Sequence, residues 1–155
     1  MTRALVAASL LFLANASTAQ ADEFDPMSRP NTVAIGVGVP SLLSASYEQR
    51  LAPHGAVGAR VGAGFVINGD AFGRIYMSPG RQTEPFFQAN IGYSEYIGWG
   101  AYSSLTAGLD VGLRHVAKGG FTVSARVGGI IPVTGDLNEI SMLAPNAAVQ
   151  LGHSF

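Results

Sequence analysis

Hydrophobic residues occupy every second position along most of the chain from Asn31 onwards. Residues 31–39 show the pattern clearly, because Val33, Ile35, Val37 and Val39 alternate with Ala and Gly. A period of two is typical of a β-strand whose two faces have different surroundings. Eight such segments follow one another, which is the smallest number of strands in a bacterial membrane barrel. The predicted strands are residues 31–39, 42–51, 56–66, 70–77, 83–93, 101–116, 120–131 and 146–155.

Residues that favour turns separate these segments. Asn68-Gly69 is the strongest turn motif, since both residues tolerate the positive φ of a type I′ turn, and it predicts a hairpin at that point. Residues 94–100 are expected to form a loop or a strand extension, and residues 133–141 form the longest polar loop. The other predicted turns are Pro40-Ser41, residues 52–55, residues 78–80 and residues 117–119.

Charged side chains are confined to one face of the predicted strands, opposite the aliphatic face. In the fourth strand Arg74 must face inward, which puts Phe72 and Tyr76 inside as well. A charged side chain that faces lipid near the bilayer midplane costs about 2–4 kcal/mol, so a lipid-facing surface requires this sorting. We therefore predict an all-β fold, an eight-stranded antiparallel up-and-down transmembrane β-barrel. Its interior polar network is expected to contain Glu48, Arg50, Arg60, Arg74, Glu84, Asp110, Arg114 and Arg126.

The composition favours a membrane barrel over a soluble β-sandwich. Hydrophobic residues make up 48% of the chain and charged residues only 12%, about half the charged share of an average soluble domain. The exposed face of a soluble sheet is usually rich in Lys and Glu, but the sole lysine here is Lys118, in a predicted turn. Nine basic and ten acidic residues produce no basic field, which makes nucleic acid an unsuitable partner.

The first 21 residues have the features of a secretory signal peptide. Arg3 gives a positive start, residues 4–14 are apolar, and Ala19-Gln20-Ala21 is a small-residue cleavage motif. The apolar stretch is too short to cross a bilayer comfortably. The expected organisation is a signal peptide at 1–21, a short periplasmic leader at 22–30 and a barrel domain at 31–155. An uncleaved membrane anchor is the alternative for the first segment.

The last strand resembles the C-terminal strand of bacterial outer-membrane β-barrels. Such strands typically end in Phe, with an aromatic residue two positions earlier and apolar residues at alternate positions before it. Phe155 and Leu151 match this pattern, while His153 stands where Tyr is usual. In that family this strand is the signal for the barrel-assembly machinery. The resemblance therefore implies that Leu151, His153 and Phe155 form an assembly signal for that partner.

Two internal segments are similar to small OmpA/OmpX-like outer-membrane barrels. Residues 84–93, Glu-Pro-Phe-Phe-Gln-Ala-Asn-Ile-Gly-Tyr, match a central strand of that superfamily, with Asn90 in place of one of the usual glycines. Residues 107–128 resemble the hairpin that follows. These motifs imply an architecture and a location in the outer membrane of a Gram-negative bacterium after export, not an activity.

The resemblance also implies an orientation, because such barrels have short periplasmic turns and longer outer loops. Turns at Pro53, Pro79 and Lys118 would be periplasmic, and outer loops would lie near Pro40, Asn68, Tyr96 and Asp136. Aromatic residues are expected to form girdles at the two membrane interfaces, with ordinary core packing as the alternative. The predicted girdle residues are Tyr93, Tyr96, Trp99 and Tyr102 at the outer interface, and Phe121 and Phe155 at the inner one with His115 and His153.

Candidate catalytic chemistry is sparse. The three histidines, His54, His115 and His153, all fall at the expected periplasmic end, and adjacent His153 and Ser154 must point to opposite faces of their strand. A serine activated by histidine and a carboxylate is therefore not predicted. Asp136, Asn138 and Glu139 offer oxygen ligands in one loop, but such a loop is usually only solvated. We expect no catalytic, metal or cofactor site.

These patterns together predict a non-enzymatic, monomeric outer-membrane β-barrel with a structural or surface-interaction role. Its expected partners are outer-membrane lipid and lipopolysaccharide, and the barrel-assembly machinery during insertion. Three alternatives stay open. They are a small-solute or ion channel, a soluble secreted barrel that binds a small apolar ligand, and a barrel enzyme that modifies lipid A.

Overall fold

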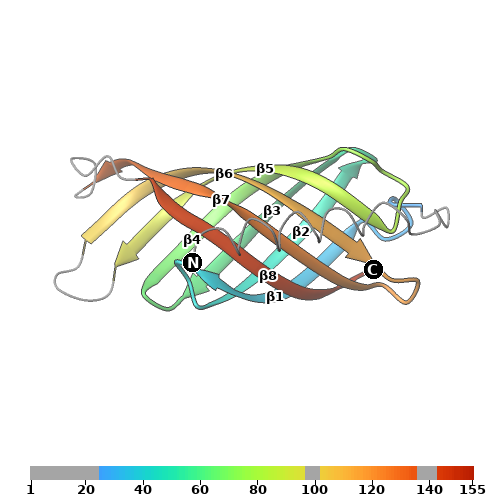
Figure 1. Ribbon diagram of the computed structural model, residues 1–155, viewed down its shortest axis with the longest axis horizontal. Coiled ribbons are helices and arrows are strands. Elements are labelled where there is room, and N and C mark those ends of the chain that lie inside the picture. Colours follow the sequence, from blue (N-terminus) through green and yellow to red (C-terminus); the bar gives the residue numbers. More distant parts are fainter. Residues whose placement is uncertain (1–24, 97–101, 136–142) are drawn as a thin grey trace, which may run out of the picture.

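The computed structural model describes residues 25–96, 102–135 and 143–155, which form one closed barrel of antiparallel strands (Figure 1). Each strand pairs with its neighbours in sequence, and β1 also pairs with β8. The predicted eight-stranded, all-β, up-and-down architecture is confirmed. Within the described ranges no helix is long and apolar enough to cross a membrane. The strands are β1 (Asn31–Val39), β2 (Leu43–Ala52), β3 (Gly55–Ala63), β4 (Val66–Tyr76), β5 (Thr83–Tyr96), β6 (Tyr102–Val116), β7 (Phe121–Gly135) and β8 (Ala144–Ser154).

The pairing of β1 with β8 closes the barrel. Its register runs from Thr32 opposite Ser154 to Val39 opposite Ala147. Beyond the ladder, the backbone N–H of Asn31 donates to the carbonyl of Phe155 at 3.0 Å, and the N–H of Phe155 donates back to the carbonyl of Asn31 at 2.9 Å. Closure removes the exposed edges that an open sheet would present.

Apolar side chains cover the outside of the barrel, and polar ones fill much of the inside. Phe72 and Tyr76 are inward-facing aromatic exceptions, as predicted, and Phe86 is buried as well. Gly112 makes room for one of them, because a Cβ at this position would lie 2.9 Å from Cε1 of the Phe86 ring. The outer surface includes Val33, Ile35, Val37, Leu43, Val57, Val61, Ile75, Phe87, Ile91, Leu109, Val111, Val127, Ile131, Val149 and Leu151.

The predicted hairpin at Asn68-Gly69 is wrong. The turn between β3 and β4 lies at Gly64-Phe65, and Asn68 and Gly69 are inside β4, paired with Gly62 and Val61. Val66, predicted to end the third strand, begins β4 and is buried. The physical reason for the difference is a set of hydrogen bonds in the barrel interior. In this register the Asn68 side chain points inward and bonds to Ser41 and to Asp70. These contacts outweigh the local turn preference of Asn-Gly.

Several strands are longer than predicted. β5 continues to Tyr96, β7 to Gly135, and β8 begins at Ala144. The extension of β5 places one formal charge on the outer surface, since Glu95 is exposed. The sorting of charge therefore holds through residue 93 but not to the end of this strand. Polar strand ends lack the apolar alternation that marks the middle of a strand, which explains why their limits were missed.

Three connections between strands lie at the end of the barrel that holds the start of β1 and the end of β8. The β2–β3 and β6–β7 turns and residues 77–82 lie there with Asn31 and Ser154, at the right in Figure 1. Residues 40–42 and 64–65 lie at the opposite end. Among the described turns, this division matches the predicted grouping, except that Gly64-Phe65 replaces Asn68-Gly69. The loops predicted near Tyr96 and Asp136 fall on residues outside the described ranges.

Adjacent glycines in the β6–β7 turn provide a test of this geometry. Gly120 has a φ of 88°, and a Cβ there would lie 2.5 Å from the carbonyl oxygen of Ser154. Gly119 has no positive φ and open space around it. We expect Gly120→Ala to lower the free energy of unfolding by about 1–3 kcal/mol, and Gly119→Ala to change it by less than about 0.5 kcal/mol. Urea unfolding in detergent micelles measures both, and equal effects would contradict this turn.

Candidate functional site

The interior of the barrel is the candidate functional site, because it concentrates the charged side chains. All eight side chains predicted for the interior network are buried there. Asp70 is buried with them, although the sequence analysis assigned no interior role to it. The signal was available, since Asp70 has the same strand parity as Arg74. The charged side chains in the described interior are thus Arg50, Arg60, Arg74, Arg114 and Arg126 with Glu48, Asp70, Glu84 and Asp110.

Glu48 is the centre of the first group of contacts, which we call the Glu48 cluster (Glu48, Arg74, Tyr76 and Arg114). Its Oε1 lies 2.8 Å from Nη1 of Arg114, and its Oε2 lies 2.6 Å from Nη1 of Arg74. The Tyr76 hydroxyl donates to Oε1 at 2.6 Å. These side chains come from β2, β4 and β6, so the cluster links strands across the barrel. Charge-assisted bonds of this kind are about twice as strong as neutral ones.

Aromatic rings cover the arginines around this cluster. Arg50 pairs with Glu84, Nη2 to Oε2, at 2.8 Å, and its guanidinium lies 3.9 Å from the centre of the Tyr76 ring. The guanidinium of Arg74 lies 4.0 Å from the centre of the Phe86 ring. Both separations suit cation–π attraction, which is stronger where water is excluded. The inward aromatic residues therefore help to hold the buried charges.

Asp110 is the centre of a second group. It accepts from Nη1 of Arg126 at 2.9 Å and from Nδ2 of Asn146 at 2.8 Å. Gln88 joins the two groups, because its Nε2 donates to Asp110 at 3.1 Å and its Oε1 accepts from Nη2 of Arg74 at 2.7 Å. A continuous chain of polar contacts thus runs from the Glu48 cluster to Asp110.

A separate ion pair joins β3 to β4. Nη2 of Arg60 lies 2.8 Å from Oδ2 of Asp70. Asn68 donates to the same oxygen at 3.1 Å and also bonds to Ser41. This contact explains the buried position of Asp70, because an isolated carboxylate in the interior would be costly.

Hydroxyl groups surround Arg114 where the barrel closes. Its Nη2 donates to Thr32 Oγ1 at 2.7 Å and to Ser154 Oγ at 2.9 Å. Ser154 also bonds to Thr122 at 2.7 Å. These contacts connect β6 with β1, β7 and β8, so one guanidinium links the first and last strands.

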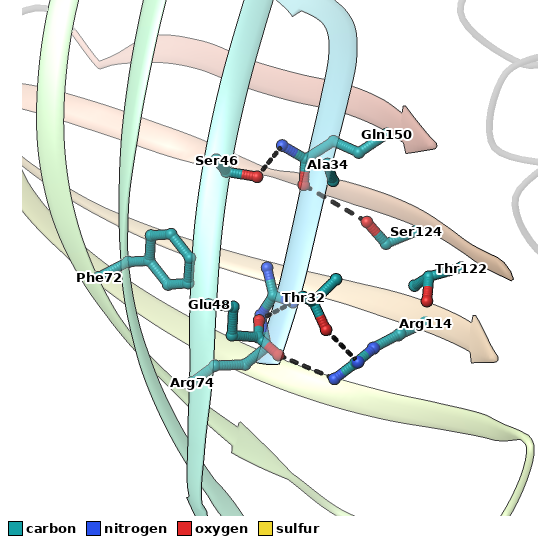
Figure 2. A pocket seen from close by; sticks show the side chains of 10 residues that line it. All are labelled: Thr32, Ala34, Ser46, Glu48, Phe72, Arg74, Arg114, Thr122, Ser124 and Gln150. Atoms are coloured by element: carbon teal, nitrogen blue, oxygen red, sulfur yellow. Dashed lines mark hydrogen bonds and ion pairs between the residues drawn. The ribbon is translucent and has the colours of Figure 1, made fainter. Parts of the chain in front are cut away.

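Two cavities of about 20 Å³ each lie among these side chains. The first, drawn in Figure 2, is lined by residues that include Glu48, Arg74, Arg114 and Gln150. The second lies beside Arg60 and Arg126. Each volume suits about one water-sized guest.

The predicted girdle and assembly residues fall on the outer surface where they are described. Tyr93, Phe121 and Phe155 are each about half exposed, and so is Leu151. The His153 ring stacks on that of Phe155, with 6.5 Å between the ring centres. Trp99, the side chains of Tyr96 and Tyr102, and residues 1–21 lie outside the described residues, and so do Asp136, Asn138 and Glu139.

The histidines all lie at the end of the barrel with the β2–β3 and β6–β7 turns. His54 Nδ1 lies 3.0 Å from the Tyr76 carbonyl, and His115 Nδ1 lies 2.9 Å from the Thr83 hydroxyl. His153 is exposed, whereas Ser154 is buried on the opposite face. Over the described ranges, no three His, Cys, Asp or Glu side chains are close enough to hold a metal ion.

Comparisons with known proteins address the fold. No protein-family model matches the chain. A search of curated proteins also found no match. Among solved structures, the chain is similar to the N-terminal β-barrel domain of OprF from Pseudomonas aeruginosa, with a TM-score of 0.62 and 13% identity over 81% of this chain and 95% of that one. The fold is that of the OprF barrel. The predicted resemblance to small OmpA-like barrels is confirmed as a likeness of fold.

Removing the carboxylate at the centre of the Glu48 cluster should be strongly destabilising. Glu48→Gln leaves the guanidinium groups of Arg74 and Arg114 without their common anion. Breaking a buried ion pair on one side costs about 3–5 kcal/mol, so we expect a loss of that size in the free energy of unfolding.

The matched control is Glu95→Gln, which removes the same charge from an exposed site. We expect it to change stability by less than about 0.5 kcal/mol. Urea titration of both variants in detergent measures the difference. Equal stabilities of the two variants would contradict the role given to Glu48.

Proposed function

We propose that the protein is an integral outer-membrane β-barrel, that lipid surrounds its apolar outer face, and that its role is structural or surface-interactive rather than catalytic. The distribution of side chains supports this proposal most directly. Leu109, Ile35 and Leu43 are 71%, 68% and 66% exposed, whereas Glu84 and Asp110 are 0% and 2% exposed. Exposed apolar area of this extent is unfavourable in water and suits a lipid environment.

A soluble barrel with an apolar ligand inside is the main rival, and the interior disfavours it. Such a barrel needs aliphatic side chains around a cavity and charges on the outside. Here buried arginines and acids occupy the inside, and both cavities have several polar lining residues. The facing of the strands is therefore the reverse of what that function requires.

The positions of the histidines favour a role without catalysis. Acyl transfer by a serine needs a histidine within hydrogen-bond distance of it and a carboxylate that orients the histidine. In the described ranges the side-chain hydrogen bonds of His54 and His115 go to a carbonyl and a threonine, and His153 stacks on Phe155. This supports a membrane scaffold over a lipid A-modifying enzyme.

The proposal includes an orientation and partners. The end with Pro53, Pro79 and Lys118 would face the periplasm, and residues 1–21 would direct export. Phospholipid and lipopolysaccharide would contact the outer face of a monomer, with Tyr93, Phe121 and Phe155 at the interfaces. The barrel-assembly machinery would insert the chain, and Leu151, His153 and Phe155 on the outer face of β8 are the residues that we propose it recognises.

Cell fractionation and gel migration test this proposal together. The full chain, expressed in a Gram-negative host, should sediment with outer membranes and resist extraction by carbonate. Because a closed barrel of paired strands resists detergent, an unboiled sample should migrate differently from a boiled one. A soluble periplasmic protein without a heat-dependent shift would overturn the proposal.

The effect on stability of a charge introduced on the outer face distinguishes lipid from water as the surroundings of that face. Leu109 is the middle residue of the 15-residue strand β6, and arginine near the bilayer midplane costs about 2–4 kcal/mol. Leu109→Arg should therefore lower the free energy of unfolding from lipid bilayers by about that amount. On a water-exposed surface the same change would have an effect within about 0.5 kcal/mol.

His115→Arg is the matched control, because residue 115 has the same outward parity at the end of the same strand. Near the interface the cost falls to about 0–1 kcal/mol. Reversible unfolding from vesicles in urea measures both variants. If Leu109→Arg were as stable as His115→Arg, the lipid-facing assignment would be wrong.

A further inference from the structure

One half of the barrel interior has an excess of positive charge. Around the Glu48 cluster, Arg50, Arg74 and Arg114 form ion pairs with two acids, Glu48 and Glu84, so this half holds one more positive than negative charge among the described residues. In the other half, Arg60 and Arg126 are balanced by Asp70 and Asp110. A net charge in a low-dielectric interior is costly. The excess therefore requires a source of compensation.

The first cavity lies directly beside this excess. Arg74 and Arg114 line one side of it together with Glu48, and the side chains of Ser46, Ser124 and Gln150 line the other (Figure 2). At about 20 Å³ it suits one small guest. Two guanidinium groups against one carboxylate give the lining a net positive charge, which favours an anion or a neutral guest over a cation.

The polar groups around the cavity have donors to spare. Nε of Arg114 is buried and has no hydrogen-bond partner among the described residues. Gln150 Nε2 donates to Ser46 Oγ at 3.2 Å, which leaves the hydroxyl hydrogen of Ser46 for another acceptor. The bond from Ser124 Oγ to Gln150 Oε1 is long, at 3.4 Å, so this hydroxyl can turn to a better acceptor. Hydroxyl, amide and guanidinium donors together suit an anion.

We propose that this cavity binds one small monovalent anion of the halide class, with chloride as the physiological form. A water molecule could occupy the volume, but it would leave the positive charge uncompensated. A single anion supplies the missing charge and accepts hydrogen bonds from the surrounding donors. The site is enclosed in the barrel, so this inference does not depend on whether lipid surrounds the outer face.

Bromide and chloride are the probes for the full chain, folded in detergent. Crystals grown with sodium bromide should show an anomalous scattering peak in the cavity beside Arg74 and Arg114. At equal ionic strength, replacing sodium gluconate by sodium chloride should raise the folding equilibrium constant about tenfold when chloride is about ten times its dissociation constant. Urea unfolding measures this change.

Gln150→Glu supplies the missing negative charge from within the protein. The two side chains have nearly the same shape, so this variant should be the more stable one in gluconate, and its response to chloride should fall below about twofold. Gln49→Glu makes the same charge change at an exposed position of β2 and should keep the tenfold response.

Three results would overturn the anion site. They are equal stability of the unmodified protein in chloride and gluconate, the lack of a bromide peak in the cavity, and an undiminished chloride response in Gln150→Glu. If Gln150→Glu does not fold, the bromide map and the salt comparison on the unmodified protein still decide the matter. Each of these outcomes is independent of membrane fractionation, so this proposal and the proposed function can fail separately.

Discussion

Pairing of the charges inside the barrel is the constraint on which the rest of the structure depends. A strand has only two faces. Once a carboxylate holds an arginine inside the barrel, the face of each remaining residue of that strand is therefore determined. Arg74 and Arg114, held together by Glu48, fix β4 and β6 against β2. The aliphatic residues at alternate positions then have no place but the outer surface. The apolar exterior is thus a consequence of the polar interior.

The sequence predicted the facing of the strands well and the limits of the strands less well. The face on which a side chain lies follows from a period of two. The alternation of charged and apolar residues shows this period, as at Glu48 and Arg50 on β2. Turn positions depend on a competition between local preference and distant contacts. At Asn68 the contacts to Asp70 and Ser41 prevailed over an Asn-Gly motif. The C-terminal end of β5, with Glu95, has no apolar alternation to mark it.

The choice of ion-pair partners could not be predicted from the sequence. The acid that each arginine contacts depends on the stagger between strands. A shift of one strand by two residues leaves each side chain on the same face but changes its ion-pair partner. Arg50 could have paired with Glu48 but meets Glu84 across the barrel. The fourth interior acid, Asp70, was missed because a turn was predicted next to it. The surplus of positive charge around Glu48 becomes visible only when these pairs are known.

What surrounds the aliphatic outer face can be measured directly. The chain has no cysteine, so a spin label can be placed at one chosen position, through Leu109→Cys, in protein reconstituted into lipid vesicles. Collisions with oxygen, which dissolves in lipid, are compared with collisions with a water-soluble nickel complex. We expect oxygen to dominate at residue 109 and nickel to dominate at Met27→Cys, outside the strands. Dominance of nickel at residue 109 would contradict a lipid-facing exterior and place the aliphatic face in water.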